Sequence, residues 1–291
     1  MRHLIKSGIR RLARPQTTPQ TNHPLGKHNA VVISVAAQKG GVGKTTTSVS
    51  MAAGLARFHN KKVLLIDLDP QGHVNTALKA QVRPGGGSIS EILTHDRGGR
   101  EVMEVVTKTH IEGLWVTPLD NRLAVTEDLM GTRIGKEFIL RDALQATRTH
   151  YDVIVIDCPP NLGNLTLNGL VAADQVLIPC DPSPLALNGV HALVDAITTV
   201  ATRLNPDIDL LGLLLTRVDG RNTTLNASVI ETIENTYEEA LLPTQIGISS
   251  SLAKAQMEGF DIFDYDPKSR GAVQYRELSE LVAQYIDSSG S

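Results

Sequence analysis

A glycine-rich segment between two regular elements constrains this chain more than any other feature. Residues 38–47 read Gln-Lys-Gly-Gly-Val-Gly-Lys-Thr-Thr-Thr; they follow the apolar run 31–37 and precede the helix-forming run 48–56. Clustered glycines let the backbone turn tightly and direct several N–H groups at one anion, and the helix that follows adds its positive N-terminal end. Strand, glycine-rich turn and helix in this order predict a phosphate-binding loop.

Two side chains of this loop carry the expected chemistry, and one position departs from the usual pattern. Lys44 supplies a cation for the β- and γ-phosphates of a nucleotide, and the Thr45 hydroxyl is an oxygen ligand suited to Mg²⁺. The usual pattern has a glycine five residues before the Gly-Lys pair, but Gln38 stands there. A second lysine, Lys39, stands at the start of the loop instead.

The pattern Lys-Gly-Gly-x-Gly-Lys-Thr is the deviant Walker A motif, and it resembles the ParA/MinD family of P-loop ATPases. The resemblance implies that ATP and Mg²⁺ are the cofactors. It implies a nucleotide site made of Lys39, Gly40, Gly41, Val42, Gly43, Lys44, Thr45 and Thr46. In that family the first lysine reaches the phosphates bound to the partner subunit, so the resemblance also implies a homodimer formed on ATP binding.

Apolar, β-rich runs recur along the chain between helix-like segments. They lie at 31–37, 62–67, 114–117, 152–157, 175–180, 210–216 and 241–248. Several are apolar throughout, as expected for parallel strands covered on both faces. This alternation predicts an α/β fold with a doubly wound, mostly parallel sheet flanked by helices, in a single domain over residues 30–287. Ligands of such sheets sit beyond the carboxyl ends of the strands.

Two carboxylates follow the second run directly. The segment 67–72 reads Asp-Leu-Asp-Pro-Gln-Gly, and the period-two spacing places Asp67 and Asp69 on one side of an extended chain. The segment resembles a motif typical of ParA proteins. The resemblance implies that Asp69 positions or activates the attacking water, while Asp67 supports the metal and the loop. A helix cap or turn aspartate is the alternative.

A third acidic motif ends the run 152–157. Residues 157–160 read Asp-Cys-Pro-Pro after a hydrophobic strand, which matches the Walker B pattern. Asp157 is then expected to hold Mg²⁺ directly or through water, since this cation prefers oxygen ligands. Thr45, Asp67 and Asp157 form the expected metal set, and Lys39, Lys44 and Asp69 the expected catalytic set. Catalysis by such a set is mainly positioning and electrostatics.

Charge is distributed unevenly along the chain. The net charge of 291 residues is −3, yet residues 1–29 carry six Lys or Arg and no Asp or Glu, which leaves −9 on the rest. We expect this arm to be basic and disordered. Ile5, Ile9 and Leu12 have helical spacing, so a short amphipathic helix could form on DNA, an anionic membrane or a partner. A solvated tail, or residues upstream of the true translation start, are the alternatives.

The C-terminal third also resembles the ParA family. Residues 213–223 and 264–272 look like two of its signatures, which favours the plasmid- and chromosome-partition branch. That branch implies non-specific DNA binding, a ParB-like partner that stimulates hydrolysis, and a cytoplasmic, nucleoid-associated location. The candidate DNA contacts are Arg217, Arg221, Lys254, Lys268 and Arg270. One departure is clear: many relatives have Ile-Pro-Arg-Asn-x-Arg where residues 246–251 read Ile-Gly-Ile-Ser-Ser-Ser.

Three alternatives stay open at this point. A related ATPase could position a protein cargo, such as a chemoreceptor cluster, by the same cycle. A MinD-like ATPase would need a membrane-seeking helix, but residues 281–291 are polar, so no membrane partner is expected. An iron protein of the nitrogenase type would need two cysteines that bridge a cluster. Cys158 and Cys180 lie in apolar runs and are instead expected to be buried, reduced thiols.

Overall fold

The computed structural model describes residues 25–95, 100–219 and 223–289. Within these residues, seven strands form one sheet in the order β3-β4-β2-β5-β1-β6-β7. The strands are Val31–Val35 (β1), Val63–Asp67 (β2), Thr107–Lys108 (β3), Leu114–Val116 (β4), Val153–Asp157 (β5), Gln175–Cys180 (β6) and Asp209–Leu215 (β7). All neighbours are parallel except β3 and β4, which are antiparallel. The predicted mostly parallel sheet is therefore confirmed.

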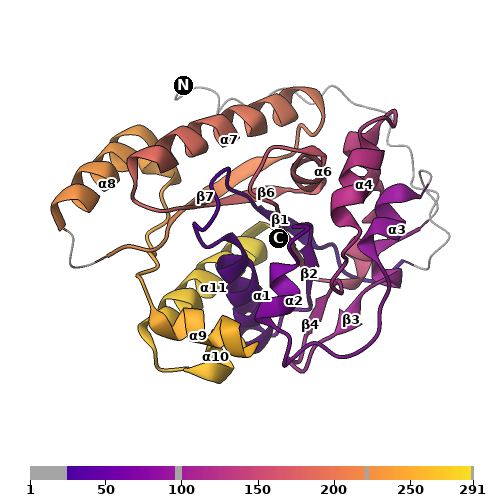
Figure 1. Ribbon diagram of the computed structural model, residues 1–291, viewed down its shortest axis with the longest axis horizontal. Helices are drawn as coiled ribbons and strands as arrows, with labels where there is room; N and C mark the ends of the chain where they lie inside the picture. The colour runs from indigo at the N-terminus through magenta and orange to yellow at the C-terminus, as the bar shows by residue number, and fades with distance from the viewer. Residues whose placement is uncertain (1–24, 96–99, 220–222, 290–291) are drawn as a thin grey trace.

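Helices cover both faces of the sheet (Figure 1). They are Lys44–His59 (α1), His73–Ala77 (α2), Ile89–Thr94 (α3), Leu123–Met130 (α4), Ile139–Ala143 (α5), Asn164–Ala172 (α6), Pro184–Arg203 (α7), Thr223–Tyr237 (α8), Ser250–Glu258 (α9), Ile262–Tyr265 (α10) and Arg270–Ser289 (α11). Short 3₁₀ segments lie at 102–104, 136–138, 147–150 and 238–240. Among the described residues, none of these helices has the length and apolarity needed to cross a bilayer.

The apolar core consists of two layers, one on each face of the sheet. Successive strand residues alternate between them: Val32 and Ile154 belong to the layer under α3–α8, whereas Ile33 and Val155 belong to the layer under α1, α2 and α9–α11. All four side chains are fully buried. Because both faces are covered, the central strands are mostly apolar, which is why the sequence shows nearly continuous apolar runs rather than alternation.

Strand register brings the predicted acidic residues to one edge of the sheet. β5 lies between β1 and β2, and Asp157 at its end pairs in register with Val35 of β1 and Asp67 of β2. The loops that follow these three strands therefore start side by side. This edge is where the phosphate loop joins β1 to α1, and where ligands of open parallel sheets bind.

Helix α1 has clear start and stop signals. Gly43 precedes it in the left-handed region at φ 88°, and Asn60 ends it at φ 52° with its N–H bonded to the carbonyl of Leu55. Left-handed residues of this kind are common helix C-caps. Inside α1, a Cβ atom added at Gly54 would lie 2.0 Å from the Ser279 hydroxyl of α11. Glycine is therefore required where the two helices pack closely.

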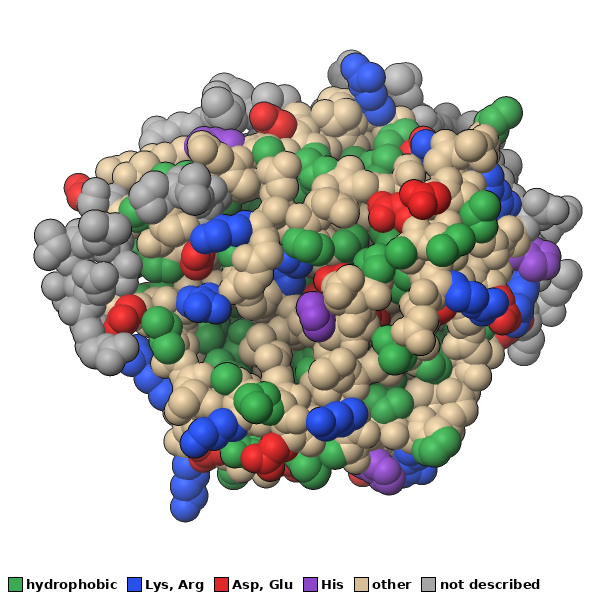
Figure 2. Space-filling model, in the orientation of Figure 1, with side chains coloured by type: hydrophobic (Ala, Val, Ile, Leu, Met, Phe, Trp, Pro, Cys, Tyr) green, Lys and Arg blue, Asp and Glu red, His purple; other side chains and the backbone are tan. Residues whose placement is uncertain are grey.

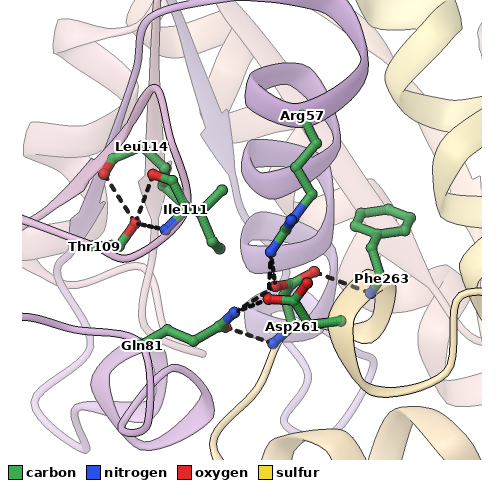
Figure 3. A network of polar contacts seen from close by, with 8 residues as sticks. Arg57, Gln81, Thr109, Ile111, Leu114, Asp261 and Phe263 are labelled. Carbon is green, nitrogen blue, oxygen red and sulfur yellow. Dashed lines mark hydrogen bonds and ion pairs between the residues drawn. The ribbon is translucent and has the colours of Figure 1, made fainter.

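A buried carboxylate joins α1 to the C-terminal helices (Figure 3). The Asp261 side chain is fully buried and accepts hydrogen bonds from Arg57 of α1 and from Gln81, each at 2.8 Å. Its other oxygen accepts the N–H of Phe263 at 2.9 Å and so caps α10. Asp264 accepts from the same two donors but is 45% exposed. Three distant chain segments are thus held together by one charged group.

Two details of the fold differ from the sequence expectations. The run 241–248 forms no strand and makes isolated bridges, from Leu241 to Leu213 of β7 and from Gly247 to Val218. The N–H groups of Leu242 and Ile246 bond the carbonyls of Leu213 and Leu215, so the chain leaves the ladder between residues 242 and 246. The hydrogen-bonded body also begins before residue 30, since the N–H of Gly26 bonds the Thr149 hydroxyl and that of His28 bonds the Thr149 carbonyl. Residues 1–24 of the predicted basic arm, with Ile5, Ile9 and Leu12, lie outside the described residues.

Candidate nucleotide site

The phosphate loop leaves one side open to a ligand. Gly41 and Gly43 have φ values of 75° and 88°, which favour glycine. A Cβ atom at Gly40 or Gly41 would meet nothing within 4 Å, so the space next to these residues is free. The first turn of α1 starts directly after Gly43. Free N–H groups, open space and a helix N-terminus together suit a phosphate group.

Lys44 points into this site from the start of α1. Its side chain is buried, at 7% exposure, and its Nζ donates to the carbonyl oxygen of Lys39 at 3.1 Å. Burial lowers the pKa of Lys44, while the nearby Asp157 and Asp69 carboxylates act in the opposite direction. A buried cation with one neutral partner is ready to bind an anion, because little water has to be removed from it first.

Asp157 lies against the hydroxyl that was expected to bind the metal. Its two carboxylate oxygens accept hydrogen bonds from Thr45 at 2.7 Å and from Ser48 at 2.8 Å. Burial raises the pKa of Asp157 to about 6, although these hydroxyls and Lys44 act to lower it. Ser48 was not predicted as a site residue, but its position one helical turn after Thr45 was a usable signal.

The donor set around Thr45 fits magnesium. A hydroxyl and a carboxylate are the hard oxygen ligands that Mg²⁺ takes, usually together with water and nucleotide phosphates. Among the residues that the structure describes, no group of three or more His, Cys, Asp and Glu side chains forms a ready metal cluster. The ion would therefore depend on Thr45, on Asp157 and on the nucleotide itself.

Asp67 and Asp69 shape the neighbouring loop in different ways. The oxygens of Asp67 accept the N–H groups of Asp69 at 3.0 Å and Val74 at 3.1 Å, so its carboxylate closes the loop onto α2. Burial, and next the charge of Asp157, raise the pKa of Asp67 well above its ordinary value. Asp69 uses one oxygen for the N–H of Gln71 at 3.0 Å, and its other oxygen lies 3.9 Å from His73.

The Lys39 side chain, at the start of the loop, turns toward the segment that follows β6 rather than into the site. Lys39 Nζ bonds Asp181 at 2.7 Å and the Ser183 hydroxyl at 3.1 Å, and its side chain is 37% exposed. Both partners follow β6 in the chain. Asp181 was not predicted, although it follows a predicted strand just as Asp157 ends one. The two loop lysines are therefore different in kind: Lys44 is buried and Lys39 lies on the rim.

Other segments brace the loop from outside. The Thr216 hydroxyl donates to the Val42 carbonyl at 2.7 Å, and the guanidinium of Arg217 donates to the Gly41 carbonyl at 3.2 Å. Gln256 of α9 donates to the Thr46 hydroxyl at 2.7 Å.

Three of the candidate DNA contacts lie in one region. Lys254, Lys268 and Arg270 are exposed and come from α9, the α10–α11 loop and the start of α11. The Ser251 hydroxyl bonds Asp266 at 2.8 Å and so holds α9 next to that loop. Lys and Arg side chains are visible over the part of the surface where α9 and α10 lie (Figure 2).

The other two DNA candidates are placed differently. The guanidinium of Arg217 bonds the carbonyl of Gly41 in the phosphate loop, and Arg221 lies outside the described residues. Two serines have local roles here: Ser249 replaces the asparagine of the family motif, and Ser251 replaces its second arginine. The Ser249 hydroxyl accepts the N–H of Leu252 as the cap of α9, and Ser251 bonds Asp266.

Both cysteines are buried and free. Burial raises the pKa of each thiol to about 12, so both are protonated near neutral pH. Metal binding and nucleophilic reactions require the thiolate. The prediction of buried thiols is therefore confirmed.

A cavity of about 920 Å³ lies away from this chemistry, at the opposite end of α1. It is lined in part by Phe58, Lys62, Trp115 and Arg276. Its cations pack on its aromatic rings: Lys62 lies 5.5 Å from the Trp115 ring centre, and Arg276 lies 4.5 Å from that of Phe58. The nucleotide site is assigned to the phosphate loop instead, because only there do the glycine turns, Lys44 and Asp157 meet.

Comparison with known proteins agrees with this geometry. The chain matches the AAA domain family over residues 30–210. It is 39% identical over 252 residues to the sporulation initiation inhibitor protein Soj of Bacillus subtilis, covering 87% of this chain and 98% of the relative. It is 38% identical over 247 residues to the chromosome partitioning protein ParA of Myxococcus xanthus, covering 85% and 86%. The chain belongs to the ParA/Soj family of deviant Walker A ATPases.

A solved structure supports the cofactor assignment. The cobyrinic acid a,c-diamide synthase of Mycobacterium smegmatis, with bound ADP and magnesium, has a TM-score of 0.75 and 35% identity, covering 89% of this chain and 96% of that one. The chain is a ParA-type P-loop ATPase, as predicted, and the ADP and magnesium of that neighbour are ligands of the class expected for its phosphate loop.

Proposed function

We propose that this chain is a partition ATPase that segregates plasmid or chromosome DNA. ATP closes a homodimer, the dimer binds DNA without reading its sequence, and a ParB-like partner stimulates hydrolysis and release. This places the protein on the nucleoid. Support comes from the family and from its named relatives, Soj and the chromosome partitioning protein ParA.

One observation carries the dimer step. Lys39 lies on the rim of the loop, 37% exposed, while Lys44 already occupies the inside of the same loop. A lysine in this place adds little to its own subunit's phosphates but can reach those of a second subunit that docks on the open edge. Its bonds to Asp181 and Ser183 must break or rearrange for this to happen.

Hydrolysis can be assigned to residues already described. Lys44 balances charge on the phosphates, and the N–H groups of the loop hold them in place. Bound magnesium would supply further positive charge to the phosphate oxygens, held by the Thr45 hydroxyl and Asp157. Asp69 has one carboxylate oxygen outside its bond to Gln71, and this oxygen orients the attacking water. Asp67 keeps the loop that carries Asp69 in position.

The DNA step rests on the exposed cations of the α9–α11 region. Lys254, Lys268 and Arg270 would contact phosphates, as would Arg221, and the affinity would fall steeply with salt. Their number is small because Ile248 and Ser251 stand where relatives have arginines, so we expect DNA affinity below that typical of the family.

The test is binding to non-specific duplex DNA with ATP, with ADP and without nucleotide, at two salt concentrations. Dimer formation is followed in parallel by light scattering. Lys39→Ala is the control, since it keeps Lys44 and the fold. ATP-dependent, salt-sensitive binding that the variant loses is the expected result. A wild-type dimer that forms with ATP but does not bind DNA at low salt would refute the partition function.

A further inference from the structure

The end of β7 contacts the phosphate loop at two consecutive carbonyl groups. Thr216 is 1% exposed, and its hydroxyl donates to the carbonyl oxygen of Val42 at 2.7 Å. The guanidinium of Arg217 donates to the carbonyl oxygen of Gly41 at 3.2 Å. Neither side chain points into the site; both hold its backbone from behind.

Holding these carbonyl groups fixes the direction of the opposite N–H groups. A trans peptide is planar, so its C=O and the next N–H point in opposite directions. With the Gly41 carbonyl held by Arg217, the N–H of Val42 points away from β7. With the Val42 carbonyl held by Thr216, the N–H of Gly43 does the same. Successive N–H groups of a glycine-rich loop are the donors that bind phosphate.

The backbone of Arg217 supports a specific role. Its φ is 54°, a left-handed value that is uncommon for a residue with a Cβ atom. Among the described residues, the other non-glycine case is Asn60, which is explained as the C-cap of α1. Arg217 does not cap a helix, so its left-handed backbone needs another explanation. Strained residues that the surrounding structure holds in place often lie at functional sites.

Hydrogen bonds on both sides impose this conformation. Before Arg217, the N–H of Thr216 bonds the Cys180 carbonyl at 2.8 Å. After it, Val218 exchanges bonds with the segment that leads to α9: its N–H bonds the Ile246 carbonyl, and its carbonyl accepts the N–H of Ile248, both at 3.1 Å. The sheet therefore holds the strained residue in the position from which its side chain reaches Gly41.

We propose that Thr216 and Arg217 are positioning residues that orient the N–H groups of Val42 and Gly43 toward the phosphates of ATP. The inference rests on the assignment of the phosphate loop as the ATP site. It also gives Arg217 a role other than the DNA contact expected from the sequence. Loss of either bond weakens nucleotide binding, because the loop then samples orientations that do not fit the phosphates.

The Thr216 bond is tested with two variants that differ by one hydroxyl. Thr216→Val keeps the side-chain shape without the hydroxyl, and Thr216→Ser keeps the hydroxyl. We expect Thr216→Val to raise the Kd for a fluorescent ATP analogue with Mg²⁺ about 3- to 10-fold, the effect of one lost hydrogen bond, and Thr216→Ser to restore most of the affinity. KM for ATP should rise while kcat stays within about 2-fold, because these donors hold substrate and transition state alike.

Arg217 is tested with glycine and alanine. Arg217→Gly removes the guanidinium but suits the left-handed backbone, so the urea midpoint should stay equal or rise while the Kd for the analogue rises about 3- to 10-fold. A merely structural role would not separate these two readouts. Arg217→Ala, measured on DNA, should keep the wild-type slope of log K against log salt.

Three outcomes would decide against the inference or its basis. Unchanged Kd values in Thr216→Val and Arg217→Gly would overturn it. An Arg217→Ala variant with normal nucleotide affinity and a DNA salt slope smaller by about one would show a DNA contact instead. Failure of the wild-type chain to bind the analogue would refute the assigned ATP site itself, and this result is distinguishable from the other two.

Discussion

Replacing Asp261 by alanine tests whether one buried carboxylate holds the C-terminal helices to α1. Asp261 is fully buried, Arg57 is 25% exposed, and the variant removes three hydrogen bonds that the carboxylate accepts. Breaking a buried ion pair by removing one partner typically costs about 3–5 kcal/mol. Arg57 is partly solvated and still has Asp264 as an ion-pair partner, so we expect the broken pair with Asp261 to cost about 2 kcal/mol. The lost cap of α10 adds about 1 kcal/mol.

The expected loss is therefore about 3 kcal/mol in the free energy of unfolding. Urea unfolding at constant pH without nucleotide, followed by circular dichroism, measures it, provided that the slope m stays the same between variants. Asp264→Ala is the matched control, because Asp264 binds the same Arg57 and Gln81 but is 45% exposed. We expect that control to lose less than about 1 kcal/mol.

Equal losses in the two variants would refute the reasoning, since burial would then not determine the cost. Addition of ATP provides a second check. The network lies at the far end of α1 from the phosphate loop, so saturating nucleotide should stabilise Asp261→Ala and the wild type by the same increment. A smaller increment in the variant would mean that the network also shapes the nucleotide site.

Three further predictions concern the site and the surface. Burial raises the pKa of Asp157 to about 6, so this carboxyl is protonated below that pH. Mg²⁺-dependent ATP affinity should therefore fall between pH 7.5 and 5.5 in a titration. A flat profile, or the same profile in Asp157→Asn, would contradict this. Asp181→Ala removes the ion-pair partner of Lys39, so the ATP dimer should form at protein concentrations about 3-fold lower, as measured by light scattering. A weaker dimer would show that the Lys39–Asp181 pair assists docking. Lys254→Ala and Lys268→Ala should each reduce the DNA salt slope by about one, and an unchanged slope would remove that residue from the DNA surface.

Much of the sheet could be predicted because its signals are local. Residues 63–66, 153–156 and 176–180 are apolar throughout, and aspartate or proline follows each run closely, so the strands and their ends were clear. The segment 241–248 has similar apolar content, but its chain leaves the ladder between Leu242 and Ile246. Apolar content predicted a strand there, and the path of the chain between these two residues decided the result.

The contacts between segments could not be predicted in the same way. Nothing in the sequence around Arg217 indicates that its guanidinium lies on the Gly41 carbonyl 176 positions away, because this depends on how β7 aligns with β6. A basic residue in a family signature suggested DNA instead. Asp181 and Ser48 were within reach of sequence reasoning: one follows a predicted strand, and the other lies one helical turn after Thr45. Neither residue belongs to one of the motifs from which the site was predicted.

The charges at the carboxyl edge of the sheet explain why ATP and magnesium act together in this fold. The Asp67, Asp69 and Asp157 side chains are buried beside a single buried cation, Lys44. Burial, and next the charge of neighbouring carboxylates, raise the pKa values of Asp67 and Asp157, so excess negative charge in the site without ligand is unfavourable. A phosphate alone would add to that excess. A divalent cation held by Thr45 and Asp157 would reverse the balance, favour the ionised carboxylates, and so make the same acidic residues compatible with a bound triphosphate.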